Sequence, residues 1–328
     1  MPVPEKLHIR VRFPFPPFFT TVKVVIFFKI TNYYGMNKYT ITQFRKDYPN
    51  DDACLDKIFQ LRYSNLVCPK CVADKPFTRV KDRRSYQCPC CGFQIYPTQG
   101  TIFEKTTTPL TYWFYAIFLQ TTTRNGVAAK ELERQLNVCY KTALRMAHQI
   151  KRLMANEKID KLTGIVEADE SYFGMKASNM TKKKRASMID ANNTFKDNKT
   201  GVMGFVSRDG KVKTEVMFGG KTFKERVRDN VSTDAILVTD SHLGYTGLDL
   251  EFAAHETVNH DKSEYKRDNW HTNTIEGFWS QLKRTIKGTH IHCDVRYLQL
   301  YADEVAFRYM NRDKQDTMFG TILSHLAS

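Results

Sequence analysis

The chain has 328 residues, 41% of them hydrophobic and 26% charged, so it is long enough for two or three folded domains with a sizeable core. Its formal net charge of +15 at pH 7 favours a polyanionic partner. Five of the eight cysteines fall between Cys68 and Cys91, which argues against a secreted disulfide framework and indicates a metal site.

Residues 1–35 differ in composition from the rest of the chain. Two apolar runs, Phe13–Phe19 and Val22–Phe28, are interrupted by prolines and lysines. These runs are too short for a membrane-spanning helix, and their flanks make a poor signal peptide. We therefore expect no membrane association. We also expect residues 1–35 to be an over-extended reading frame, with Met36 as the natural initiator; a genuine N-terminal extension or anchor is the alternative.

Two C-x-x-C knuckles separated by 16 residues lie in an N-terminal segment that we place at 36–105. The spacing predicts a structural zinc ribbon whose ligands are Cys68, Cys71, Cys88 and Cys91. Cys90 is left over, because only Cys91 keeps the C-x-x-C spacing from Cys88. Redox chemistry is the alternative for such pairs, but the sequence around them lacks a βαβ pattern. A ribbon of this size needs zinc in order to fold.

Residues 106–160 carry helical periodicity. Thr108 and Pro109 suit the N-cap and the first position of a helix, and apolar residues follow at helical spacing from 110 to 118. Two more helices are expected at 127–136 and 140–150, with a turn between them. This pair is typical of a helix-turn-helix, in which Lys141 and Arg145 would contact DNA. A plain helical bundle is the alternative.

From residue 161 to 315 the pattern changes to an α/β arrangement. Short apolar strands are expected at 165–168, 201–206, 212–218 and 236–239, and amphipathic helices at 271–284 and 297–309. A basic insertion between the first two strands is expected to be a mobile loop. Its cations either are simply solvated or grip DNA phosphates; they are Lys182, Lys183, Lys184 and Arg185.

Carboxylates stand at two strand ends and on the helix that follows. Asp169 and Asp240 each close an apolar run, and Glu276 lies two helical turns before Lys283, so this acid and base share one flank. Magnesium and manganese prefer oxygen ligands, and two such ions about 3.5–4 Å apart can activate an attacking hydroxyl and stabilise the leaving oxygen at phosphorus. The set predicts a two-metal phosphoryl-transfer site. Asp169 would bridge both ions, Asp240 and Glu276 would each hold one, and Lys283 would contact phosphate.

Each acid also has a simpler interpretation. An Asp at a strand end is more often a turn or cap residue, so none of these acids is persuasive alone. Glu167 and Glu170 flank Asp169 and are alternative ligands. If Val166 and Ala168 point inward, alternation puts Glu167 and Asp169 together on the opposite face.

Three stretches, Val166–Gly174, Val238–Asp240 and His271–Arg284, resemble in this order the DDE transposases of bacterial insertion sequences that carry an N-terminal zinc ribbon. This is the ISXO2-like family, which is related to the Merlin elements. The resemblance begins at Met36 and ends at Asp313. It implies an RNase-H-like, retroviral-integrase-like catalytic domain over 161–315 and metal-dependent strand cleavage and transfer.

The resemblance also bears on single residues. It selects Asp169 over its neighbours as the first acid. Members of the group have either Glu or Asn as the third catalytic residue, so Asn273 and Glu276 both remain open. We favour Glu276, because it is the one spaced seven residues before Lys283 and because a carboxylate is the better magnesium ligand. Arg284 is an expected DNA contact.

The resulting expectation is a DNA transposase that binds the ends of its insertion sequence through the ribbon and the helical module. Its partners would be double-stranded DNA, both element ends and target, and at least a second copy of the chain for synapsis. It would work in the bacterial cytoplasm at the nucleoid, with two catalytic Mg²⁺ or Mn²⁺ ions and a structural Zn²⁺. The alternatives are a domesticated, catalytically inactive DNA-binding protein, a nuclease of the same fold, and a zinc-ribbon transcription factor. The last is disfavoured, because DNA binding alone gives no reason to gather carboxylates beside an anion.

Overall fold

The structure is a computed structural model that describes residues 39–64, 66–155, 159–174, 181–186, 199–258 and 271–327. All of the described residues belong to one unit, Lys38–Ser328. The expectation that residues 1–35 are an over-extended reading frame therefore falls outside the described residues. Across the described ranges, no helix is both long and apolar enough to cross a membrane.

The ribbon is preceded by two helices that the sequence did not predict, α1 (Ile41–Asp47) and α2 (Asp51–Tyr63). Each begins after a residue whose side chain caps it, because Thr40 and Asn50 accept a hydrogen bond from a backbone N–H of the first turn. The ribbon itself is a three-stranded antiparallel sheet of β1 (Thr78–Arg79), β2 (Tyr86–Gln87) and β3 (Gln94–Ile95).

Ion pairs from basic residues of the ribbon hairpin join the ribbon to α2. Arg79 forms a 2.7 Å ion pair with Asp52, and Arg84 forms a 3.2 Å ion pair with Asp51. Asp51 also accepts hydrogen bonds from the backbone N–H groups of Leu110 and Thr111, each at 3.0 Å. One carboxylate therefore joins the ribbon to the start of the next helix, α3 (Leu110–Thr122).

This arrangement corrects the expected start of α3. Pro109, not Thr108, is the N-cap residue, and it has no side-chain cap bond. The unpaired N–H groups of the first turn are instead satisfied by Asp51, 59 and 60 residues earlier in the chain. The next two helices, α4 (Ala129–Leu136) and α5 (Tyr140–Ala155), match the predicted pair, and the turn between them has Asn137 in the left-handed region at φ 50°.

The second half of the chain is built on a five-stranded mixed sheet with the order β6-β5-β4-β7-β8. Within this sheet, β4, β5 and β6 pair antiparallel, whereas β7 and β8 run parallel to β4. The strand β8 was not predicted from the sequence. The bounds are β4 (Ile165–Phe173), β5 (Thr200–Ser207), β6 (Val212–Val216), β7 (Ile236–Asp240) and β8 (Ala254–Val258).

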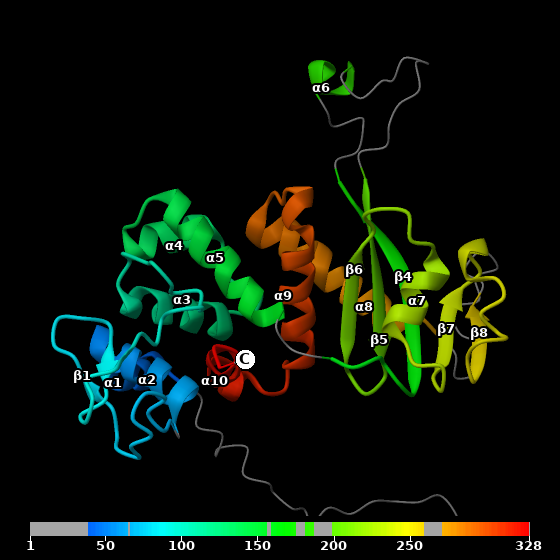
Figure 1. Cartoon of the computed structure of the whole chain (residues 1–328). Helices are drawn as coiled ribbons and strands as arrows, with labels where there is room; N and C mark the ends of the chain where they lie inside the picture. Colours follow the sequence, from blue (N-terminus) through cyan, green and yellow to red (C-terminus); the bar gives the residue numbers. More distant parts are fainter. Residues whose placement is uncertain are drawn as a thin grey trace, which may run out of the picture. The chain divides into compact units, whose positions relative to one another are not determined.

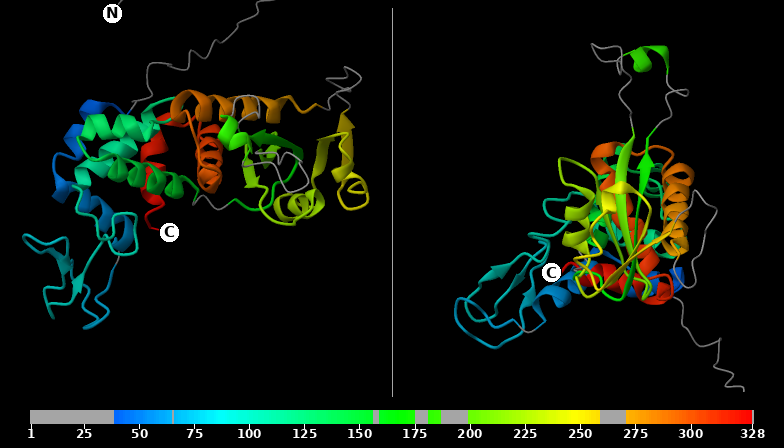
Figure 2. Two further views of the ribbon diagram at one scale, coloured as in Figure 1. Left: turned by 90° about the horizontal axis from the view of Figure 1, so that it is seen from above. Right: turned by 90° about the vertical axis from the view of Figure 1, so that its right-hand side faces the viewer.

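Helices cover both faces of this sheet (Figure 1, Figure 2). Val166 and Ala168 of β4 point toward α7 (Phe223–Asn230), in a core that also holds Val227. The other face packs against α8 (Asn273–Arg284), whose Ile275 and Phe278 lie in a core with valines of β5 and β6. The α/β prediction is therefore confirmed, with the sheet as the middle layer.

The helix α9 (Leu298–Met310) links this half to the helical half, since it packs against both β6 and α5. Its Val305 lies in the core beside the sheet, but its Phe307 lies in the core of the helical half, together with residues of α10 (Gln315–Ser324). The side of α9 that carries Phe307 therefore packs against helices and not against the sheet. The two faces of α9 serve two different cores.

The basic insertion after β4 was expected to be a loop, but part of it is helical. Residues Lys182–Ala186 form the short helix α6. The remainder of the insertion lies outside the described residues.

Candidate active site and metal centre

Strand register brings the two predicted aspartates side by side. The parallel pairing of β4 with β7 aligns Glu167 with Val238, and continuing it by two residues aligns Asp169 with Asp240. Neighbouring strands lie about 4.8 Å apart, and residues at the same level point to the same face. Both aspartates therefore point to the face covered by α8. Asp240 is the last residue of β7, as expected, but Asp169 lies in the middle of β4 and not at a strand end, because β4 continues to Phe173.

Glu167 lies on that face too, but it has a different task. Its carboxylate is fully buried and accepts hydrogen bonds from the backbone N–H groups of Thr274 and Ile275 at 2.9 and 3.0 Å. The Thr274 hydroxyl donates a third, at 2.8 Å. Thr272, the N-cap residue of α8, makes no side-chain cap bond of its own. Glu167 therefore caps α8 from β4 and fixes the level at which this helix begins.

Trp279 connects α8 to Asp169. Its indole N–H donates a 2.9 Å hydrogen bond to Oδ2 of Asp169. Gly204 lies opposite Asp169 on β5, and a Cβ built there would lie only 2.7 and 2.8 Å from the Trp279 ring. The missing side chain at Gly204 thus lets the indole lie against the strand, where its N–H reaches Asp169.

On α8, Glu276 lies closer than Asn273 to Trp279, the residue that contacts Asp169. Both Glu276 and Asn273 are exposed. At about 100° per residue, Glu276 is turned about 60° from Trp279, whereas Asn273 is turned about 120° from it. Lys283 is also exposed and lies about 40° from Trp279, so it shares the flank of Glu276.

The acids of this site interact electrostatically. Burial raises the pKa of Asp169, and the negative charges of Asp240 and Glu276 raise it further. Hydrogen bonds from Trp279 and from the backbone N–H of Glu170 oppose these effects. A cation between the carboxylates would relieve their repulsion, so the donor set fits a divalent metal with oxygen ligands. Within the described residues, the acids do not form a preassembled metal group of the kind that the cysteines form.

Glu170, the other alternative ligand, points to the opposite face of β4. Burial raises its pKa, and the Tyr245 hydroxyl donates a 3.0 Å hydrogen bond to its Oε2. Tyr245 lies in the core beside α7. The geometry therefore separates three neighbouring acids: Glu167 caps α8, Glu170 bonds to Tyr245, and Asp169 faces Asp240 and Glu276.

The cysteine cluster is preassembled. The Sγ atoms of Cys68, Cys71, Cys88 and Cys91 all lie within 4.8 Å of one another. Two of the distances, Cys68 to Cys91 and Cys71 to Cys88, are 3.6 Å. A tetrahedral ion with metal–sulfur bonds of about 2.3 Å requires sulfur atoms about 3.8 Å apart, so the cluster fits such an ion. Cys90 is exposed and is not a member of this group.

The predicted DNA contacts lie on several elements. Lys141 and Arg145 are exposed on the first turns of α5, and Arg284 is exposed at the end of α8. Lys182 and Lys183 are exposed on α6, and the side chains of Lys184 and Arg185 fall outside the described ones.

Residues 161–310, which contain the sheet, the acids and α9, match the family model of the ISXO2-like transposase domain. The match covers 150 of the 328 residues and supports an insertion-sequence transposase. It is also 26% identical over 251 residues to an uncharacterized protein in the transposable element ISH50 of Halobacterium salinarum, a match that covers 73% of this chain and 84% of that protein.

One solved structure, described as a pre-cleavage Mos1 transpososome, matches this transposase at 15% identity over 62% of the chain and 75% of its own. The TM-score is 0.17, which is too low to establish a shared fold. The assignment to the family therefore rests on the sequence match over 161–310 and on the ISH50 relative.

Proposed function

We propose that this transposase binds the ends of an insertion sequence and cuts and joins DNA by metal-dependent phosphoryl transfer at Asp169, Asp240 and Glu276. The observation that supports the proposal is the parallel pairing of β4 with β7 up to Glu167 and Val238, which, continued by two residues, would set Asp169 beside Asp240. Asp169 also accepts a hydrogen bond from Trp279 of α8, the helix that holds Glu276. Burial raises the pKa of Asp169, and the negative charges of Asp240 and Glu276 raise it further, which supports a site that a cation would stabilise.

The fold supports the same proposal. Three antiparallel strands followed by two parallel ones, in the order β6-β5-β4-β7-β8, are what we expect of an RNase-H-like domain over 161–315. The first acid lies on the central strand, the second at the end of its parallel neighbour, and the third on a helix packed across that face. We propose that residues 36–105 and 106–160 form the end-recognition modules, with a zinc ribbon in the first and Lys141 and Arg145 in the second.

In the proposed reaction, two Mg²⁺ or Mn²⁺ ions would supply Lewis-acid chemistry at the phosphorus. Asp169 would hold both ions, while Asp240 and Glu276 would each hold one. Trp279 would keep Asp169 oriented through its N–H, and Lys283 would pair with a phosphate oxygen of the DNA. Double-stranded DNA and a second copy of the chain are the proposed partners, in the bacterial cytoplasm at the nucleoid.

The test is strand cleavage of DNA that carries the ends flanking this gene, in Mg²⁺, by the chain from Met36. Asp240→Asn and Glu276→Gln should each lower the cleavage rate at least about 100-fold, because each removes a charged ligand. Asn273→Ala is the matched comparison for the third acid and should lower the rate much less. Binding without cleavage by the unsubstituted chain would favour an inactive DNA-binding protein. Cleavage without joining would favour a nuclease of the same fold.

A further inference from the structure

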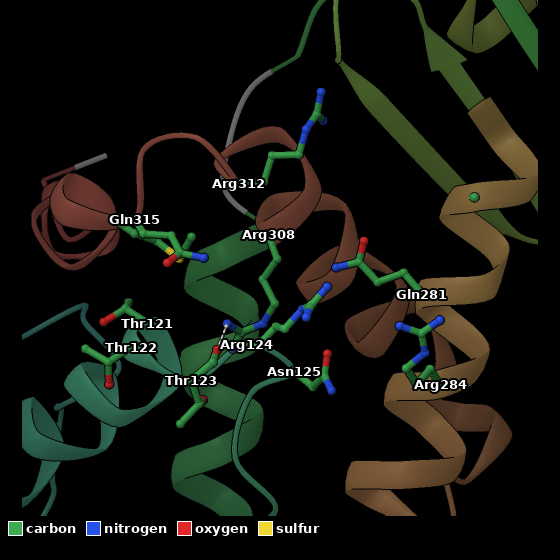
Figure 3. A pocket seen from close by; sticks show the side chains of 12 residues that line it. Thr121, Thr122, Thr123, Arg124, Asn125, Gln281, Arg284, Arg308, Arg312 and Gln315 are labelled. Atoms are coloured by element: carbon green, nitrogen blue, oxygen red, sulfur yellow. Dashed lines mark hydrogen bonds between the residues drawn. The ribbon is translucent and has the colours of Figure 1, made fainter. Parts of the chain in front are cut away.

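A cavity of about 570 Å³ lies beside α8, on the flank turned away from the sheet (Figure 3). Its walls come from the end of α3 and the loop that follows it, from α8, and from α9, α10 and the segment between them. Gln281 extends from α8 across it toward Arg124 and Arg308 (Figure 3). The cavity is large enough for a small ligand, but its polar lining does not suit an apolar one.

The lining is strongly positive. It contains Arg124, Arg284, Arg308 and Arg312, and no Asp or Glu is among the described residues that form it. Within the described ranges, neither Arg124 nor Arg284 is ion-paired with a carboxylate, and Arg312 has a 3.7 Å pair with the exposed Asp313. Guanidinium groups gathered in this way repel one another unless an anion lies between them.

The buried charged residues next to the cavity do not neutralise the positive charge of its lining. Buried Arg308 pairs with Glu304 at 2.9 Å, but Glu304 also pairs with buried Lys151 at 2.7 Å. One carboxylate therefore faces two buried cations, and the network keeps a net positive charge. Arg308 also donates a 3.2 Å hydrogen bond to the backbone carbonyl of Thr123, which fixes its guanidinium at the cavity wall (Figure 3).

The cavity and the acids share one helix. Gly277, Gln281 and Arg284 line the cavity at spacings of four and three residues, while Glu276 and Lys283 lie on the adjoining flank. From Glu276 to Arg284 the helix rises about 12 Å. Measured along the axis of duplex DNA, this length contains about three or four phosphates of one strand. A strand whose phosphate lies at the acids can therefore place neighbouring phosphates at the cavity.

We propose that this arginine pocket binds the phosphodiester backbone of the DNA beside the cleavage position, through Arg124, Arg284 and Arg312. This proposal rests on the proposed function, because the pocket would be a second binding site for the DNA that is cleaved at the acids. Guanidinium groups suit this task, since they bind phosphate oxygens in bidentate geometry, and Gln281 adds an uncharged donor.

Gly277 offers a sharp test, because a Cβ built there meets no atom within 4 Å and a side chain at this position extends into open space at the pocket. Gly277→Glu and Gly277→Gln have nearly the same size, and both residues are better helix formers than glycine. We expect a labelled DNA duplex, titrated by fluorescence anisotropy against the zinc-loaded chain in buffer without Mg²⁺ or Mn²⁺, to bind the Glu variant at least about 10-fold more weakly than the Gln variant. Equal affinities would overturn the proposal.

A second readout counts phosphate contacts. In Arg124→Gln/Arg284→Gln the slope of log affinity against log salt, measured from about 50 to 200 mM KCl, should become shallower by about 2. Arg45→Gln removes an exposed cation from α1 and should leave the slope almost unchanged. The same change of slope for Arg45→Gln and for the pocket variant would also overturn the proposal.

Two further measurements distinguish a small-anion site from a DNA site and separate this proposal from the proposed function. If inorganic pyrophosphate raises the Tm of the unsubstituted chain but not of Arg124→Gln/Arg284→Gln, while duplex affinity is the same for both, the pocket takes a small anion and the DNA proposal fails. If the unsubstituted chain cleaves DNA in Mg²⁺ and Asp240→Asn does not, the proposed function stands whatever the pocket variants show. If the unsubstituted chain does not bind duplex DNA, both proposals fail.

Discussion

The cysteine cluster and the acid site are assembled in opposite ways. The four thiol groups come from two knuckles between Cys68 and Cys91, and their Sγ atoms lie within 4.8 Å of one another. The acids come from β4, β7 and α8, between Asp169 and Glu276, and they do not form such a group in the described residues. The cysteine geometry is set by local turns, whereas the acid geometry is set by strand register and by the seating of a helix.

This difference predicts which substitutions should disrupt each site. Substitution of a ligand should destroy the cysteine site, while its neighbours matter little. The acid site should be sensitive also to residues that never touch a metal, because Glu167, Gly204 and Trp279 decide where α8 lies. Point substitutions at both sites can test this contrast.

The largest expected effect is that of Cys91→Ser. A structural zinc site contributes about 10–16 kcal/mol of apparent binding free energy in small zinc-finger peptides, so loss of one thiolate should release the ion and unfold the ribbon. Cys90→Ser changes the neighbouring, exposed thiol and should keep one zinc per chain. Zinc content by mass spectrometry and thermal unfolding would measure both variants. Equal zinc content in the two would contradict the assignment.

Gly204→Ala should have the next largest effect. Its Cβ would overlap the Trp279 ring, and overpacking of this kind costs about 1–3 kcal/mol and would displace the indole from Asp169. We therefore expect both a lower free energy of unfolding and a loss of strand cleavage. In Gly201→Ala, on the same strand, the new Cβ would meet the flexible end of Met217 at 2.7 Å, so we expect a smaller change. Similar losses at the two glycines would refute the role of Trp279.

Glu167→Ala removes the cap of α8. Loss of three hydrogen bonds to a buried carboxylate should lower the free energy of unfolding by about 2 kcal/mol and lower cleavage, because the start of α8 is released. Glu170→Ala removes a neighbouring acid that accepts one hydrogen bond, from Tyr245, and should cost less. Denaturant unfolding compares the two. A larger loss for Glu170→Ala would show that the cap is unimportant.

The smallest effect concerns Asp169→Asn and pH. Burial and neighbouring acids raise the pKa of Asp169 above its ordinary value of 3.8, so the folded state binds this proton more tightly than the unfolded state. The resulting stabilisation is present at low pH and is lost as pH rises through the folded pKa. Without divalent metal, Asp169→Asn should therefore raise the Tm by a few degrees at pH 7. At pH values below 3.8, the ordinary pKa of aspartate, it should not change the Tm. A gain that persists in acid would point to another cause.

The sequence predicted those parts of the fold that depend on local pattern. The helices near 110, 140, 273 and 298 and the first four strands of the sheet follow from periodicity, and the choice of Cys91 over Cys90 agrees with the geometry of the cysteine cluster. The assignment to the transposase family is confirmed by the match over 161–310.

The parts that the sequence did not predict depend on distant contacts. Thr108 looked like the cap of α3, but the cap is Asp51; Glu167 looked like a possible metal ligand, but it caps α8. Local spacing cannot reveal partners 59 or 107 residues away. Gly204 is a similar case, since its importance appears only when the Trp279 ring is placed against β5. A glycine in the middle of an apolar strand, between Met203 and Phe205, was the one available signal.

The most direct test of the central claim is Mn²⁺ binding to the zinc-loaded chain, measured by electron paramagnetic resonance for the unsubstituted protein and for Asp240→Asn. Oxygen ligands suit manganese and thiolates do not, so the ribbon should not contribute to the signal. The account predicts saturable Mn²⁺ binding that weakens at least about 10-fold in the variant, because one charged ligand is lost. Equal Mn²⁺ affinity in the two proteins would contradict a carboxylate metal site at Asp169, Asp240 and Glu276.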